Sequence, residues 1–221
     1  MKIAVLANGQ WDAEWGRLEL ARFDYLICAD GGGNSALLTG RIPDVLIGDL
    51  DSITPENLEL CRRNDVLIQQ YPREKDETDL ELALEYALNM LGTKMSSPNA
   101  SSREMSSLWL YGATGGRVDH LLGNLALLLK FLNRGCCIHI KDPLHEIYMI
   151  RGRETLKGRA GQELSIIPVT EKIRVTTDGL FYPLHGEFIL KESPRGISNV
   201  FLEEQAVVQV EEGIALLVLL T

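Results

Sequence analysis

The feature that most constrains the fold is an alternation in residues 1–143, where a short apolar strand, a glycine- or acid-rich loop and a helix follow one another repeatedly. Strands joined through helices form a parallel sheet with helices on its faces. In such sheets ligands bind beyond the carboxyl ends of the strands, so these loops are the place to look for a site. The expected strands are residues 3–7, 25–29, 45–48, 66–69, 108–111 and 136–141.

The pattern changes after residue 143, because short β segments separated by turn residues follow one another without a long helical period. The expected segments are 146–150, 163–169, 172–176, 179–184, 186–190, 197–202, 206–210 and 214–220. That is typical of an antiparallel sandwich or barrel. We therefore expect an α/β protein with two domains: a parallel, Rossmann-like α/β domain over residues 1–143 and an all-β sandwich domain over residues 144–221. The polar, serine-rich stretch 93–107 is interpreted as a loop without an assigned function.

Charge and cysteine content narrow the class of protein. The net charge of −9 argues against non-specific binding of nucleic acid or of an anionic membrane. Four cysteines without a Cys-x-x-Cys pair, most of them inside apolar runs, indicate buried thiols in a reducing compartment. The N-terminal apolar run is too short for a signal peptide, and the C-terminal run 214–220 is too short to span a bilayer. We expect a cytoplasmic protein.

The central motif is Gly48-Asp49-Leu50-Asp51-Ser52, directly after a buried strand. In an extended chain Asp49 and Asp51 would point to the same side. Two carboxylates about 4 Å apart repel by roughly 4 kcal/mol at an effective dielectric constant of about 20, and a hard cation such as Mg²⁺ removes that cost. The alternative is a plain surface turn at the end of a strand.

Three further loops carry candidate residues at strand ends. Adjacent glycines at a strand-to-helix junction allow backbone amides to approach an anion, although a tight turn explains them as well. Thr54-Pro55-Glu56 and the capping box at Thr78 predict two helix starts. Asp79 follows the cap Thr78, and a favourable interaction with the helix dipole is the structural alternative for it. For the loop that contains Arg117 and Asp119, a plain ion pair between these two residues is the structural alternative. His120 by itself is more typical of a residue that caps a helix or packs. The loops read Asp30-Gly31-Gly32-Gly33-Asn34, Lys75-Asp76-Glu77-Thr78-Asp79 and Gly115-Gly116-Arg117-Val118-Asp119-His120.

These motifs, followed by Thr177-Asp178-Gly179-Leu180 and Gly196-Ile197-Ser198-Asn199, together resemble the thiamine pyrophosphokinase family over nearly the whole chain. The chain departs from the family in its serine-rich insert, in Asn8-Gly9 where a glycine pair is frequent, and in Tyr182 where some members carry a tryptophan that stacks on thiamine. Tyrosine can also stack.

The resemblance implies transfer of pyrophosphate from ATP to the hydroxyl of thiamine, giving thiamine diphosphate and AMP. It also implies a homodimer with each thiamine site between two subunits. Asp49, Asp51 and Asp79 would hold Mg²⁺ and, with Asp119, form the catalytic set, in which Asp79 or Asp119 would take the hydroxyl proton. ATP and its phosphates would meet Asp30, Gly31, Gly32, Asn34, Lys75, Thr78 and Arg117. Thiamine would meet Tyr182, Ser198 and Asn199.

Two other functions remain open from the residues. One is a different Mg²⁺-dependent nucleotidyl or phosphoryl transferase that uses the same acidic pair with another acceptor. The other is a non-catalytic module that binds a nucleotide or thiamine. The product separates them, because AMP release indicates pyrophosphoryl transfer and ADP release indicates ordinary phosphoryl transfer.

Overall fold

The computed structural model describes residues 1–92 and 106–221. Contacts divide these residues into two compact units. The first unit comprises residues 1–92, 108–127 and 140–143, and the second comprises the remaining described residues. The expected loop 93–107 lies outside the described residues except for its last two, which open strand β5 (Ser106–Tyr111) two residues earlier than the sequence predicted.

The first unit contains a parallel sheet, as predicted. Strand β1 pairs in parallel with both β2 and β5, and β2, β3 and β4 follow in order on one side. Because β1 has β2 on one side and β5 on the other, the chain changes direction across the sheet at β1, and ligands bind at such switch points. The strands are β1 (Ile3–Leu6), β2 (Tyr25–Ala29), β3 (Val45–Gly48) and β4 (Leu67–Gln70), with β5 as given.

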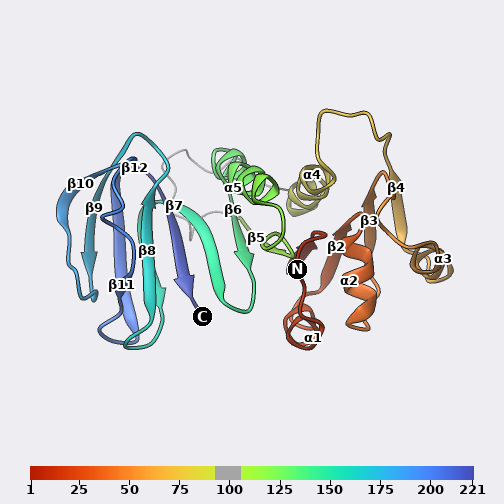
Figure 1. Cartoon of the computed structure of the whole chain (residues 1–221), viewed down its shortest axis with the longest axis horizontal. Helices are drawn as coiled ribbons and strands as arrows, with labels where there is room; N and C mark the ends of the chain where they lie inside the picture. Colours follow the sequence, from red (N-terminus) through yellow and green to blue (C-terminus); the bar gives the residue numbers. More distant parts are fainter. Residues whose placement is uncertain (93–105) are drawn as a thin grey trace. The chain divides into compact units, whose positions relative to one another are not determined.

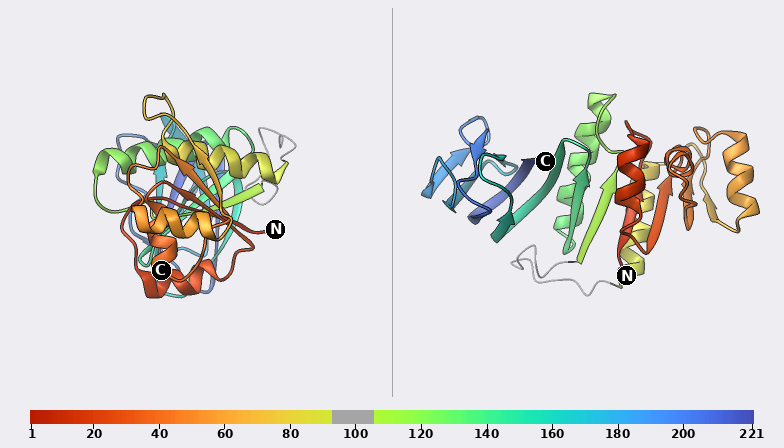
Figure 2. Two further views of the ribbon diagram at one scale, coloured as in Figure 1. Left: turned by 90° about the vertical axis from the view of Figure 1, so that its right-hand side faces the viewer. Right: turned by 90° about the horizontal axis from the view of Figure 1, so that it is seen from below.

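Helices cover both faces of this sheet, with α4 on one face and α1 and α2 on the other (Figures 1 and 2). Two predicted helix starts are confirmed: Thr54 Oγ1 accepts a hydrogen bond from Asn57 N, and Thr78 Oγ1 accepts one from Glu81 N. The sequence did not predict α1. The helices are α1 (Ala13–Leu20), α2 (Gly32–Leu38), α3 (Pro55–Arg63), α4 (Asp79–Leu91) and α5 (Val118–Leu132).

Aromatic side chains pack beside α1 in the first unit. They form four edge-to-face pairs and one tilted pair, with ring centroids 5.7 to 6.3 Å apart. Glu19 of α1 links this cluster to Lys141. Its Oε2 accepts hydrogen bonds from Tyr111 Oη at 3.0 Å and from Lys141 Nζ at 2.9 Å. The cluster consists of Trp11, Trp15, Phe23, Trp109 and Tyr111.

The second unit is rich in antiparallel strands, which confirms the predicted change in character. Helix α5 and strand β6 (Cys136–Lys141) each contribute residues to both units. The remaining strands are β7 (His145–Lys157), β8 (Glu163–Pro168), β9 (Lys172–Asp178), β10 (His185–Leu190), β11 (Asn199–Val200) and β12 (Gln205–Leu220).

Strand β12 corrects the prediction of two separate segments at 206–210 and 214–220. Its first half pairs with β9 and its second half with β8, while β7 runs along both halves. The register shifts between Val210 and Ala215, so the strand changes partner without ending. The expected strand at 179–184 is also wrong, because Leu180 makes only an isolated bridge to Phe201 there.

Two whole-chain predictions can be compared with the structure. All four cysteines are free and buried, as expected. Of the helices in residues 1–92 and 106–221, none combines the length and apolar character that crossing a bilayer requires.

Candidate active site

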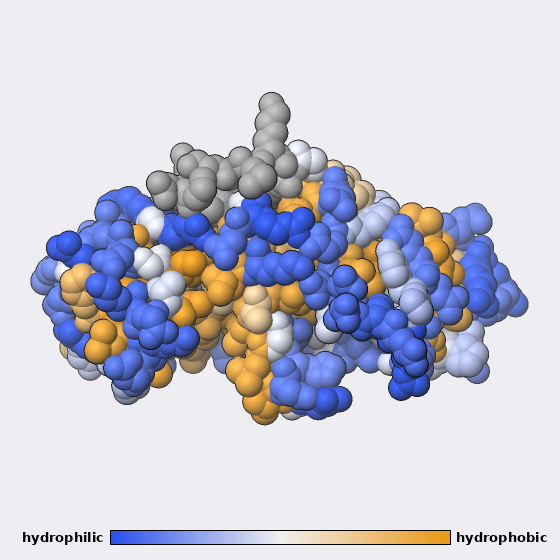
Figure 3. Space-filling view, turned by 90° about the horizontal axis from the view of Figure 1, so that it is seen from above, coloured by the Kyte–Doolittle hydropathy of each residue, from blue (hydrophilic) through white to orange (hydrophobic). Residues whose placement is uncertain are grey.

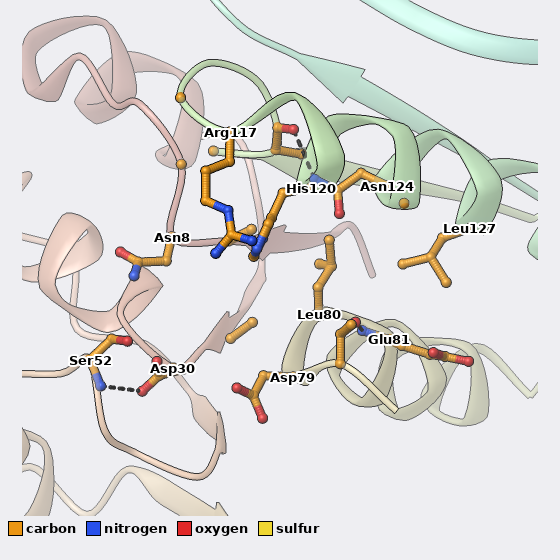
Figure 4. Close-up of a pocket in the computed structure, with 18 of the residues that line it drawn as sticks. Asn8, Asp30, Ser52, Asp79, Leu80, Glu81, Arg117, His120, Asn124 and Leu127 are labelled. Atoms are coloured by element: carbon orange, nitrogen blue, oxygen red, sulfur yellow. Dashed lines mark hydrogen bonds between the residues drawn. The ribbon is translucent and has the colours of Figure 1, made fainter. Parts of the chain in front are cut away.

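A cavity of about 1010 Å³ lies in the first unit, beyond the carboxyl ends of β1, β2, β3 and β5. It lies where the strand order changes, which is the place that the sheet topology predicts for a ligand. Figure 4 shows side chains from several loops pointing into it. The polar and charged side chains that line it are Asn8, Gln10, Asp30, Asp49, Asp51, Ser52, Arg73, Lys75, Glu77, Thr78, Asp79, Glu81, Thr114, Arg117, Asp119, His120 and Asn124.

Three carboxylates converge in this cavity. Asp30, Asp49 and Asp79 each offer an oxygen atom within 4.8 Å of the others. Burial raises the pKa of Asp79, and the charges of Asp49 and Asp30 add to that effect. Lys75 Nζ lies 2.9 Å from Asp79 Oδ1 and lowers the pKa in opposition. One lysine does not balance three carboxylates, and the oxygen-only donor set suits a hard cation such as Mg²⁺.

Gly48 makes this convergence possible. Its φ of +153° is unusual for a residue with a side chain. A Cβ atom at this position would lie 2.9 Å from Asp30 Cβ and 3.1 Å from Asp79 Cγ. Any larger residue would therefore push the carboxylates of Asp30 and Asp79 apart.

The backbone between Asp49 and Asp51 is not extended, which corrects the geometry assumed from the sequence. Strand β3 ends at Gly48, and Leu50 has a φ of +66°. Asp51 N donates a hydrogen bond to Asp49 Oδ1 at 3.2 Å, as in an Asx turn. Asp51 is exposed, and its Oδ2 lies 3.7 Å from Arg73 Nη2. The carboxylate beside Asp49 is therefore that of Asp30, where we expected that of Asp51.

Asn34 holds the loop that carries these acids. Its Nδ2 donates to Ser52 O at 2.9 Å, and its Oδ1 accepts from Thr54 N at 3.0 Å and from Asn57 Nδ2 at 2.9 Å. Asp30 Oδ1 also accepts a hydrogen bond from Ser52 N at 3.2 Å. The side chain of Asn34 is thus engaged by protein, although the sequence suggested a contact with ATP.

The predicted glycines Gly31 and Gly32 lie where neighbouring chain segments come close. A Cβ on Gly31 would lie 2.4 Å from the side chain of Asn8, and one on Gly32 would lie 2.1 Å from Leu6 O. Their small size therefore serves packing against the end of β1. Their role toward phosphate stays a prediction, as does that of Thr78, whose hydroxyl caps α4.

Arg117 and Asp119 form an exposed pair at the start of α5. Arg117 Nε and Nη2 donate to the two carboxylate oxygens of Asp119 at 3.1 and 2.5 Å. The hydrogen bond from Arg117 lowers the pKa of Asp119 to about 2. His120 also points into the cavity (Figure 4). With Lys75 and Arg73, Arg117 gives the pocket three cationic side chains, which suits an anionic ligand.

The loops after β1 and β5 support each other at this end of the cavity. Gly9 N donates to Gly112 O at 2.7 Å, and Gln10 N donates to Thr114 O at 3.2 Å. Asn8, Gln10, Arg73 and Asn124 were not predicted as site residues. Their position in loops or helices that start at strand ends was the available signal.

The predicted thiamine residues lie in the second unit. Tyr182 is 61% exposed and Ser198 is exposed with a φ of +57°. Asn199 is buried, and protein groups satisfy its side-chain amide. Its Oδ1 accepts a hydrogen bond from Tyr182 N at 3.0 Å, and its Nδ2 donates one to Tyr182 O at 2.7 Å. The amide of Asn199 therefore holds the backbone of Tyr182, and the ring of Phe181 packs edge-to-face on that of Tyr182 at 4.9 Å.

Comparison with known proteins gives a consistent result. Residues 17–140 match the sequence model of the thiamin pyrophosphokinase catalytic domain, and residues 145–215 match that of the thiamin pyrophosphokinase vitamin B1 binding domain. Thiamine pyrophosphokinase from Bacillus subtilis is 31% identical over 195 residues, which is 87% of this chain and 85% of the relative. Thiamine pyrophosphokinase 1 from Oryza sativa is 29% identical over 80% of this chain and 72% of the relative.

Solved structures agree with the sequence matches. The crystal structure of the Bacillus subtilis thiamine pyrophosphokinase has a TM-score of 0.83 at 28% identity and covers 100% of this chain and 99% of its own. The thiamin pyrophosphokinase of Geobacillus thermodenitrificans has a TM-score of 0.79 at 27% identity, with 100% and 98% coverage. The chain therefore belongs to the thiamin pyrophosphokinase family.

Proposed function

We propose that this chain transfers a pyrophosphoryl group from ATP to the hydroxyl of thiamine, giving thiamine diphosphate and AMP. This is the known reaction of the family to which the chain belongs. The observation that carries the proposal is the cluster of Asp30, Asp49 and Asp79, which faces cationic side chains in one cavity at the end of a parallel sheet. A site of this kind suits a metal-bound polyphosphate.

Mg²⁺ is part of the proposal because the oxygen donors fit it. Asp49 and Asp79 were predicted as ligands from the sequence, and Asp30 joins them in the structure. Asp51 remains a candidate through a different orientation of its exposed side chain. When bound, the ion would neutralise charge on the phosphate oxygens.

The chain's own cations have a separate task in the proposed reaction. The hydroxyl oxygen of thiamine forms a bond to the β-phosphorus of ATP, and the bond from that phosphorus to the α,β-bridging oxygen breaks. The electron pair leaves with AMP, so negative charge grows on the phosphate chain. Lys75 and Arg117 are placed in the cavity to stabilise it.

The hydroxyl proton needs an acceptor, for which Asp79 and Asp119 are the two candidates. The pKa of Asp119 is lowered to about 2 by Arg117, which makes Asp119 a weak base. Burial raises the pKa of Asp79, which favours proton uptake there when the carboxylate does not bind the metal. Asp79→Asn and Asp119→Asn separate the two candidates, because substitution of the true base should lower turnover more than ATP binding.

Thiamine recognition is proposed to need a second copy of the chain. None of the residues that line the cavity is Phe, Tyr or Trp, although thiamine carries aromatic rings. The second unit presents the side chains of Phe181 and Tyr182, which are 59% and 61% exposed. Ser198 is also exposed, and it directly precedes Asn199, which bonds to the backbone of Tyr182. Apolar residues also reach the surface among polar ones in the view of Figure 3. A homodimer in which Tyr182 and Ser198 complete the site of the partner would account for these exposed groups.

A cytoplasmic location is part of the same proposal. It is supported by the four free, buried cysteines, which are typical of proteins in a reducing compartment. ATP, as co-substrate, is available there.

The decisive test is an assay with ATP, Mg²⁺ and thiamine that separates AMP, ADP and thiamine diphosphate. We expect equal amounts of AMP and thiamine diphosphate, and a strong reduction of both in Asp49→Asn. Asp65→Asn is the matched control, because Asp65 is exposed and does not line the cavity. ADP instead of AMP would indicate a phosphoryl transferase with another acceptor. Tight ligand binding without turnover would indicate a non-catalytic binding module.

A further inference from the structure

The cavity has two ends of different character. The acidic end holds Asp30 and Asp79, and the other end is bordered by Leu80 and Leu127, with the carboxylate of Glu81 at its edge (Figure 4). Leu80 directly follows Asp79 at the start of α4, so the apolar end begins one residue away from the carboxylates. A ligand that extends from the acidic end into this space would need a polyphosphate on one side and an uncharged body on the other.

Asn124 places a side-chain amide at the end of the cavity that Leu80 and Leu127 border. It lies on α5, and its Nδ2 donates a hydrogen bond to Ala113 O at 2.9 Å. A carbonyl oxygen can only accept, so this contact fixes which end of the amide carries the nitrogen. Oδ1 consequently points into the cavity, as Figure 4 shows. It is an acceptor in a fixed position, and the second hydrogen of Nδ2 is available beside it.

Gly123 keeps space open next to Asn124. It lines the cavity, and a Cβ atom built on it would meet no atom within 4 Å. Glycine in the interior of a helix costs about 1 kcal/mol relative to alanine, and here packing does not require it. Open space between leucine side chains and beside a fixed amide acceptor is suited to a flat ring.

We propose that this end of the cavity binds a nitrogen heterocycle that carries an exocyclic amino group, with Asn124 Oδ1 accepting a hydrogen bond from the amine. An asparagine amide matches the edge formed by such an amine and the adjacent ring nitrogen, as in its pairing with adenine. This inference rests on the proposed function, whose two substrates both carry that edge: the adenine of ATP and the aminopyrimidine of thiamine. Asn124 would then determine specificity for one of them.

The test compares ligands with and without the amine by titration calorimetry, which does not require turnover. ATP is compared with ITP, and thiamine with oxythiamine, in wild type and in Asn124→Leu. In one of the two pairs, the wild type should bind the ligand with the amine about tenfold more tightly than the ligand without it, as expected for one hydrogen bond. Asn124→Leu should reduce this affinity ratio to about one. Asn89→Leu, the same change on an exposed position of α4, should leave the ratio unaltered.

The ligand pair whose affinity ratio falls to about one in Asn124→Leu identifies whether adenine or the aminopyrimidine ring binds beside Asn124. Unchanged ratios for both pairs in Asn124→Leu, or no discrimination by the wild type, would overturn the proposal. Because binding is measured directly, discrimination that depends on Asn124 in a protein without pyrophosphoryl transfer would reject the proposed function and retain this site.

A second variant tests the space itself. Gly123→Leu should weaken ATP and ITP equally, or thiamine and oxythiamine equally, by about tenfold, because the added side chain fills the ring position. Binding of inorganic triphosphate, which has no ring, should stay the same. Unchanged affinity for all four ring ligands would show that the ring lies elsewhere. Gly123→Ala serves as the control for helix stability, since alanine favours the helix.

Discussion

The acidic loop of the first unit and the aromatic turn of the second unit are held in the same way but present opposite chemistry. In each, the side-chain amide of one asparagine bonds to backbone groups of the turn: Asn34 holds Ser52 and Thr54, and Asn199 holds Tyr182. The first turn places Asp49 beside Asp30 and Asp79, whose carboxylates repel it, and the second turn exposes two aromatic rings.

The difference shows which parts of a site need a ligand to be stable. The carboxylates of Asp30, Asp49 and Asp79 lie together with Lys75 as the close counter-charge, so a bound cation would stabilise that arrangement. The rings of Phe181 and Tyr182 pack on each other and lose little without a ligand. Binding energy is thus expected to depend on ions in the first unit and on apolar contact in the second.

The largest effect should come from removing a carboxylate from the first unit. We expect Asp49→Asn to lower turnover by about 10²- to 10³-fold, because the substitution removes a negative charge that would hold the metal at the polyphosphate. The same substitution should raise the free energy of unfolding in EDTA by up to about 1 kcal/mol, since repulsion with Asp30 and Asp79 is relieved. Product assays and urea unfolding measure the two quantities. Lower stability in EDTA together with lower turnover would mean that Asp49 has a structural role.

The two asparagines should differ when each is replaced by alanine. Asn199→Ala leaves the partly buried N–H and C=O groups of Tyr182 without their two side-chain partners, so we expect a loss of about 2 kcal/mol of unfolding free energy and about a tenfold higher KM for thiamine. Asn34→Ala affects a half-buried side chain, so we expect a loss of about 1 kcal/mol and a higher Mg²⁺ concentration for half-maximal activity. The opposite pattern, with Mg²⁺ dependence following Asn199, would contradict the division of roles.

The pH dependence of stability should show a smaller effect centred on Asp79. Its pKa is raised above the ordinary value of 3.8, chiefly by burial, so the native state binds this proton more tightly than the unfolded state. Native stability from this group is therefore present at low pH and is lost as the pH rises from about 3.8 through the raised pKa. Urea unfolding in EDTA should show that Asp79→Asn flattens this decline. An unaltered slope in Asp79→Asn would assign the decline to other groups.

The sequence predicted what local signals specify. The alternation of strands and helices, the caps at Thr54 and Thr78 and the loops that form the cavity all depend on residues close together in the chain. The acids and cations of the first unit were found for the same reason, because the carboxyl ends of parallel strands meet at one edge.

The sequence did not predict features that depend on distant residues. Helix α1 is stabilised in part by Glu19, whose partner Lys141 lies 122 positions away in the chain. The left-handed Leu50 turns Asp51 away from the position that an extended chain would give it. Gly213 allows β12 to continue past a register shift, and no local pattern distinguishes that from two strands.

The aromatic cluster of the first unit has a spectroscopic consequence. The chain has three tryptophans, Trp11, Trp15 and Trp109, and all of them belong to that cluster. Tryptophan emission is therefore an optical label of the first unit alone, present without any engineering. Its change during denaturation reports the melting of the α/β part, and far-ultraviolet circular dichroism that is lost at a different denaturant concentration would report separate melting of the β-rich part.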